Sequence, residues 1–236
     1  MFLPYNSSLI KTNESIEKIA QLNADQNITP VIIGTRQLMA HHVERVGKLV
    51  GVGLRTHLMD NLGSVQQAAD KIAQSAKEID VPVWFESRIL EDELSFPSLK
   101  SSGSQTGIGK DAIELNTKFY RNHTESTDEF WIVEVPTQHS YQIPAYMNFG
   151  GENSCPHPRE HVAIHKRWNE MYSTQIVAIS DDTIEVLVAS PPSTMEQALE
   201  LAREQLVYSP KIIESQQTID NLAFVLKNSS TWKFIW

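Results

Sequence analysis

Cysteine, positive charge and long apolar runs are all scarce in this chain of 236 residues. Its single cysteine, Cys155, excludes an intrachain disulfide and favours a reducing compartment. The 20 Lys and Arg against 29 Asp and Glu give a formal net charge of −9, which disfavours nucleic acid and anionic membranes as partners. No apolar run approaches the roughly 20 residues of a membrane-spanning helix. The first residues also lack the basic and apolar regions of a signal peptide. We therefore expect a cytoplasmic protein that binds neither nucleic acid nor membrane.

What is present is an ordinary globular composition, 41% apolar and 21% charged, which can bury a substantial core. In the first third of the chain, apolar periodicity predicts alternating helices and strands. The predicted elements are a helix over 13–22, a strand over 30–34, a helix over 38–49, a helix over 64–79 capped by Ser64, and a strand over 82–86. Strands separated by helices are typical of a parallel or mixed sheet with helices on its faces.

Residues 95–128 interrupt this pattern. The stretch over 98–110 is rich in Ser and Gly, and 122–128 is polar without a period, with a short predicted helix over 112–119 between them. We interpret 95–128 as a flexible loop or linker. It would separate an N-terminal α/β unit, residues 1–94, from a C-terminal α+β domain, residues 129–236.

Regular patterns return after this segment. They predict strands over 130–135, 175–179, 183–189 and 232–236, and a further candidate strand over 143–149. They also predict three helices: one from Pro156 or Pro158 to Tyr172, one that begins at a capping box over Ser193–Glu196, and one over 218–226. Asp181 and Asp182 fall between two strands, which is typical of a hairpin turn. The predicted fold class is α/β (α+β), with one or more mixed β-sheets flanked by helices.

Several short motifs follow one another through the C-terminal region. They are Pro144-Ala145-Tyr146, Gly150 to Pro156, Glu160-His161-Val162-Ala163, Arg167-Trp168 with Tyr172, Ile184-Glu185-Val186, Pro191-Pro192, Glu196-Gln197-Ala198, Leu201-Ala202, Tyr208-Ser209-Pro210 and the closing 232–236. Through these residues the region resembles a bacterial family catalogued as domain of unknown function 4253. The resemblance implies no established activity, and it implies the general character of toxin–immunity proteins. Relatives tend to carry Cys-Pro-Asp at Ser209-Pro210-Lys211, which weakens a catalytic or metal role there.

Reactive side chains are densest at the start of the helix predicted to end at Tyr172. Cys155, His157, His161 and His165 combine thiol and imidazole groups, which suit zinc. The same spacing is typical of the buried face of an amphipathic helix, where histidines usually hydrogen-bond to carbonyl groups. A zinc site and a packed face both remain as interpretations. A further hypothesis makes Cys155 a nucleophile with His161 as its base.

The loop over 148–153 is the region where we expect function, because it is rich in glycine and polar groups and joins two regular elements. The candidate binding residues are Tyr146, Phe149, Glu152, Asn153, Cys155, His161 and Trp168. Their aromatic members are equally typical of a core. Elsewhere, His41 and His42 point to different faces of one predicted helix, so we place His41 in solvent and His42 at the edge of the core.

Three functions are compatible with these patterns. The first is a non-catalytic protein-binding module, such as an immunity-type inhibitor of a toxin, with a protein partner of basic or complementary surface. The second is a metal- or cysteine-dependent hydrolase with its site over Gly150–Trp168. The third is a ligand sensor with a pocket between the two halves of the chain. We expect the first, because no catalytic motif is complete, and we expect no cofactor apart from the zinc alternative.

Overall fold

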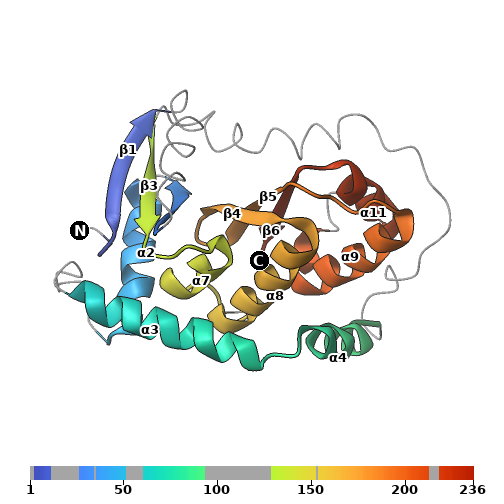
Figure 1. Cartoon of the computed structure of the whole chain (residues 1–236), viewed down its shortest axis with the longest axis horizontal. Coiled ribbons are helices and arrows are strands. Elements are labelled where there is room, and N and C mark those ends of the chain that lie inside the picture. Colours follow the sequence, from blue (N-terminus) through green and yellow to red (C-terminus); the bar gives the residue numbers. More distant parts are fainter. Residues whose placement is uncertain are drawn as a thin grey trace.

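The computed structural model describes residues 3–11, 27–34, 36–51, 61–93, 129–152, 154–212 and 218–236. Within these residues the chain forms one mixed, six-stranded β-sheet with helices packed against it (Figure 1). The α/β fold class is therefore confirmed. The predicted helices over 13–22 and 112–119 and the predicted linker over 95–128 lie outside the described residues.

The strands of the sheet come from both sides of the predicted linker. They are β1 (Asn6–Lys11), β2 (Thr29–Gly34), β3 (Glu129–Val135), β4 (Thr174–Ile179), β5 (Thr183–Val188) and β6 (Thr231–Ile235). Their order is β1-β3-β2-β4-β5-β6, so β3 lies between two strands of the N-terminal region. Both regions therefore contribute backbone hydrogen bonds to the same sheet.

The helices pack on one face of the sheet and share its hydrophobic core. The longer ones are α2 (Arg36–Leu49), α3 (Leu62–Ser75), α4 (Val81–Glu93), α8 (Pro158–Tyr172), α9 (Met195–Tyr208) and α11 (Ile219–Asn228). Short helical turns are η3 (Ala76–Glu78), η5 (Ser140–Gln142), α7 (Ile143–Tyr146) and η6 (Pro210–Ile212). In Figure 1, α3 and α4 follow one another along the lower side of the molecule. None of the helices within the described residues is long and apolar enough to cross a membrane.

Two caps differ from the predicted ones although their helices are confirmed. The α3 helix begins at Leu62 with Asn61 as its N-cap, which places Ser64 inside the helix. The α9 capping box uses Thr194 and Gln197, one residue later than predicted. In both places the residue types favour a cap at more than one position, and the tertiary packing of the first turn selects between them.

The predicted strand over 82–86 is wrong, because these residues belong to α4. Asp80 caps this helix through its carboxylate, which accepts a hydrogen bond from the Val83 N–H at 3.2 Å. In a strand, Val81, Val83 and Phe85 would share one face. In the helix Val81 and Phe85 are buried, whereas Val83 is 55% exposed. Pro82 fits the first helical turn, where no backbone donor is needed.

The predicted strand over 143–149 is also wrong. Residues 143–146 form α7, and the Phe149 N–H donates to the Pro144 carbonyl at 2.9 Å, which folds the segment back on itself. Ile143, Met147 and Phe149 are completely buried. A short apolar run of this kind does not distinguish a buried strand from a buried helical turn, because both are apolar at every position.

The centre of the sheet contains its one parallel pair among the described strands. β2 and β4 run parallel, with Ile32 opposite Ala178, while the other neighbouring strands pair antiparallel. From this central pair the sheet continues to β3 on one side and to β5 on the other. In open α/β sheets, ligands bind beyond the carboxyl ends of strands at such a point. Here α2 follows β2, and the turn over 180–182 follows β4. We call this place the switch point.

Candidate functional site

The glycine-rich loop predicted to carry function is a compact turn between α7 and α8. Asn148, Gly150 and Gly151 all have positive φ angles, at 47°, 94° and 83°. A Cβ atom on Gly150 would lie 2.1 Å from the Pro156 carbonyl oxygen, so only glycine fits there. The Gly151 N–H donates to the same carbonyl at 2.9 Å. The loop is therefore held in one shape by its own backbone. Its Asn153 lies outside the described residues.

Cys155 and His161 meet beneath this loop. The Cys155 Sγ atom lies 3.4 Å from Nε2 of His161, which is completely buried. Burial raises the pKa of the Cys155 thiol to about 12, although the Arg45 guanidinium nearby pulls it downward. Burial also lowers the pKa of His161 well below its ordinary value. Near neutral pH both groups are therefore uncharged.

Tyr208 joins His161 to His165 through a shared hydroxyl group. Its Oη atom lies 2.5 Å from Nδ1 of His161 and 2.8 Å from Nε2 of His165. All three side chains are buried, and burial lowers the pKa of His165 to about 3. We call Cys155, His161, His165 and Tyr208 the Tyr208 network. Four aromatic side chains surround it, namely Phe149, Trp168, Phe234 and Trp236.

The two ring nitrogens of His161 have different neighbours. Nδ1 lies 2.5 Å from the Tyr208 hydroxyl, and Nε2 lies 3.4 Å from the Cys155 thiol. The Pro156 carbonyl partly offsets the lowering of the His161 pKa. The shorter contact of the imidazole is therefore with Tyr208, and the contact with the thiol is the longer one.

The predicted zinc ligands are divided between two environments. Cys155, His161 and His165 belong to the Tyr208 network, whereas His157 caps α8, where its N–H donates to a Glu160 carboxylate oxygen at 2.7 Å. Across the described part of the chain, no group of three or more His, Cys, Asp or Glu side chains is arranged to hold a metal ion.

The remaining candidate binding residues lie in different surroundings. Phe149 and Trp168 are completely buried and pack into the core, and the Tyr146 hydroxyl donates to Asp70 on α3 at 2.7 Å. Glu152 is the candidate that reaches solvent, with 71% of its side chain exposed. Ser209 is buried and exchanges two hydrogen bonds with the backbone of Ile235. In this chain its hydroxyl anchors β6.

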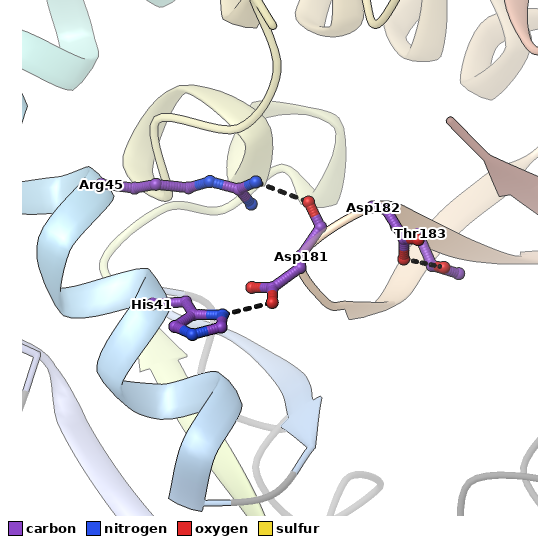
Figure 2. Close-up of polar contacts among 5 residues, drawn as sticks. All are labelled: His41, Arg45, Asp181, Asp182 and Thr183. Carbon is purple, nitrogen blue, oxygen red and sulfur yellow. Dashed lines mark hydrogen bonds and ion pairs between the residues drawn. The ribbon is translucent and has the colours of Figure 1, made fainter. Parts of the chain in front are cut away.

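A second polar cluster lies at the switch point. His41 and Arg45, one helical turn apart on α2, both reach Asp181 in the turn between β4 and β5 (Figure 2). His41 pairs with the Asp181 carboxylate, and Arg45 donates to the Asp181 backbone carbonyl at 2.6 Å. His42 is buried next to them and interacts electrostatically with both Arg45 and Asp181. We call His41, His42, Arg45 and Asp181 the switch-point cluster.

The buried side of the switch-point cluster, which we call its inner side, contains polar atoms without hydrogen-bond partners. They are both ring nitrogens of His42, Nη1 of Arg45 and Oδ1 of Asp181. The Ile179 carbonyl is close enough to raise the pKa of His42, but neither ring nitrogen reaches hydrogen-bond geometry. Burial still dominates and lowers the pKa of His42 to about 4. A buried polar group left unsatisfied costs on the order of 1–3 kcal/mol.

The sequence did not reveal this cluster. His42 was expected at the edge of the core, but it is completely buried. The doublet His41-His42 and the turn at Asp181 are both visible in the sequence, but His41 and Asp181 are 140 residues apart. No local pattern joins positions so far apart. The parallel pairing of β2 with β4 brings them together.

Arg45 connects the switch-point cluster to the glycine-rich loop. Its guanidinium lies over the Phe149 ring, 5.4 Å from the ring centroid. Its backbone carbonyl accepts a hydrogen bond from the Asn148 side chain at 2.9 Å. One turn later, Lys48 lies 3.8 Å from Glu152. The loop, α2 and the β4–β5 turn therefore form one continuous candidate site.

Comparison with known proteins places the C-terminal part of the chain in context. Residues 131–236 match the model of the family described as domain of unknown function (DUF4253). The match starts within β3 and covers the glycine-rich loop, the Tyr208 network and the β4–β5 turn. Neither the search of curated proteins nor the search of solved structures gave a match.

Proposed function

We propose that this chain is a non-catalytic protein-binding module of the bacterial cytoplasm, of the kind represented by immunity-type inhibitors of toxins. The observation that carries the proposal is the state of the Cys155–His161 pair. Burial raises the pKa of the thiol to about 12, and its imidazole neighbour makes its shorter contact, 2.5 Å, with the Tyr208 hydroxyl. A cysteine nucleophile needs a thiolate and a free base beside it. The geometry therefore favours a structural role for the pair beneath a displayed loop.

The surface above this pair carries four carboxylates, and Lys48 lies 3.7 Å from Glu44 and 3.8 Å from Glu152 on it. Carboxylates from three elements are exposed there: Glu44 on α2 with 51% of its side chain exposed, Glu152 in the loop with 71%, and Asp181 in the β4–β5 turn with 31%. Asp182, beside Asp181, is exposed as well. We call these four residues the acidic surface. The rigid backbone beneath it limits the entropy lost on binding, and its charge suits a basic partner.

The proposal can be tested by capture with matched variants. Tagged wild-type protein, Glu152→Lys and Glu200→Lys are used to retain proteins from lysate of the native host, followed by mass spectrometry. Glu200 lies exposed on α9, so the control makes the same charge change at a different surface. We expect a stoichiometric partner with wild type and Glu200→Lys that is lost with Glu152→Lys.

Calorimetry with the purified partner then measures the effect on affinity. We expect Glu152→Lys to weaken binding by at least about tenfold, because it places like charges opposite each other in the interface. Co-expression tests whether the partner is a toxin that the chain neutralises. Equal binding by all three proteins, or no partner, would remove the support for this surface.

The alternative function is a metal- or cysteine-dependent hydrolase over Gly150–Trp168. The observation in its favour is the 3.4 Å contact between Cys155 Sγ and His161 Nε2. Alkylation of Cys155 by iodoacetamide across pH 6–10 distinguishes the two functions. The raised thiol pKa predicts a rate that rises without reaching a plateau in this range. A plateau below pH 8, or zinc near one per chain that is lost in His161→Ala, would favour the hydrolase.

A further inference from the structure

We infer that the inner side of the switch-point cluster binds one water molecule, held by His42, Arg45 and Asp181, which links α2 to the β4–β5 turn. The site shares Asp181 with the acidic surface but uses the buried Oδ1 atom of that side chain, and the inference does not depend on the proposed function. It starts from four buried polar atoms that lack partners: Nδ1 and Nε2 of His42, Nη1 of Arg45 and Oδ1 of Asp181.

These atoms belong to side chains whose other contacts hold them in place. Arg45 is fixed by its bond to the Asp181 carbonyl at 2.6 Å and by the Phe149 ring beneath it. The Asp181 carboxylate is fixed by His41 through its other oxygen. His42 is locked by complete burial on the same helix. The unpartnered atoms therefore cannot turn toward solvent to find their hydrogen bonds there.

The chemistry of the cluster matches a water molecule. Arg45 Nη1 is a donor, Asp181 Oδ1 is an acceptor, and a neutral imidazole is one of each. Buried water usually makes two to four hydrogen bonds to groups that would otherwise be unsatisfied. Nη1 of Arg45 and Oδ1 of Asp181 both lack a hydrogen-bond partner, so these two atoms do not bond to each other directly. A water between them would accept from Arg45 and donate to Asp181.

The position of the site gives this water a structural consequence. It lies beyond the carboxyl ends of β2 and β4, where the two halves of the chain meet. The existing contacts between α2 and Asp181 are on the outer side, with His41 half exposed. The water would complete the same connection on the inner side, so that the β4–β5 turn is held from both sides.

A crystal structure of the full chain at better than about 1.5 Å resolution tests the inference directly, because ordered waters are then resolved. We expect a single-atom peak within hydrogen-bond distance, about 2.7–3.2 Å, of Arg45 Nη1 and Asp181 Oδ1. A direct contact between these two atoms with no peak between them would overturn the inference. Density for an ion or for a larger molecule would overturn it as well.

Nuclear Overhauser contacts between water and the His42 ring provide a test in solution. We expect a contact from long-lived water in wild type that is lost in Asp181→Ala and kept in Asp182→Ala. The control changes the neighbouring aspartate, whose carboxylate bonds to the Thr183 hydroxyl at 2.9 Å instead. A wild-type protein without this contact, or an Asp181→Ala protein that keeps it, contradicts the inference. The wild-type measurement remains decisive if Asp181→Ala does not fold.

Discussion

The Tyr208 network and the switch-point cluster both bury histidine, but they satisfy it differently. His161 and His165 share the Tyr208 hydroxyl, and the aromatic rings that contact these three side chains belong to the C-terminal region. His42 is equally buried, has no hydrogen-bond partner among the described side chains and backbone, and lies between regions far apart in the sequence. Burial by itself therefore does not show whether the polar atoms of a histidine are satisfied. Nδ1 of His165 also lacks a partner, but each histidine of the Tyr208 network has at least one hydrogen bond, whereas both ring nitrogens of His42 lack one.

The aromatic support of the Tyr208 network has the largest expected effect. Trp168 is completely buried and packs against Phe85, Tyr208, Trp232 and Phe234. Trp168→Ala should lower the free energy of unfolding by about 3–5 kcal/mol, because it leaves a cavity that the core cannot fill. Urea unfolding measures this loss. The exposed Val83→Ala is the control, with an expected change below about 0.5 kcal/mol. A small loss at Trp168 would mean that this core is loosely packed.

Removing the Tyr208 hydroxyl sharpens the comparison further. Tyr208→Phe keeps the ring and leaves Nδ1 of His161 and Nε2 of His165 without partners. We expect a loss of about 2–4 kcal/mol in the free energy of unfolding, because each unsatisfied buried atom costs about 1–3 kcal/mol. Tyr172→Phe is the matched control, since that hydroxyl makes no hydrogen bond with the described residues, and it should change stability by less than about 1 kcal/mol. Equal effects of the two variants would show that the network is not stabilising.

His42 makes stability depend on pH. Its pKa is lowered from 6.5 to about 4 by burial, so the unfolded chain binds a proton more readily than the folded one. This contribution to stability is complete above pH 6.5 and is lost as the pH falls from 6.5 to 4. Since one pKa unit corresponds to about 1.4 kcal/mol, wild type should lose about 3 kcal/mol more than His42→Leu between pH 7 and pH 4.

Urea unfolding of both proteins at pH 7, 5.5 and 4 measures this difference. The other titrating groups are common to the two proteins, so their contributions cancel in the comparison. Parallel stability curves for wild type and His42→Leu would contradict a buried, neutral His42.

The outer side of the switch-point cluster has the smallest expected effect. His41 pairs with Asp181, but about half of its side chain is exposed. His41→Ala should therefore lower the free energy of unfolding by less than about 1 kcal/mol, and the loss should shrink as salt is added. Unfolding at low and high ionic strength measures it. A loss as large as that of Tyr208→Phe would mean that the two regions do not differ in the way described.

The sequence predicted most of the regular elements, and the two wrong strands share a cause. Residues 82–86 and 143–149 are short, apolar and interrupted by proline, so neither a helical nor a strand period is visible in them. In α4 the decisive feature is tertiary, because Phe85 packs on Trp168 while Val83 stays in solvent. Longer elements such as α8 and α9 were predicted because their apolar period extends over several turns.

The candidate site also has contacts that were predictable from the sequence and contacts that were not. The contact of Cys155 with His161 and the proximity of Phe149 were predictable, because these residues are close in the sequence and flank one helix start. The partner of both histidines, Tyr208, is more than 40 residues away on α9. Its role could not be predicted, because a tyrosine at the end of an apolar helix is most often a packing residue.

The sequence by itself determined the fold class, the expected absence of a disulfide, the acidic charge and the position of the glycine-rich loop, because each depends on composition or on neighbouring residues. The tertiary structure alone decided that His42, Arg45 and Asp181 share one site. It also decided that the shorter contact of His161 is with Tyr208 and not with Cys155. The physical reason is that hydrogen-bond partners and burial depend on the pairing of distant strands. Only the arrangement of β2 beside β4 brings those residues within reach of one another.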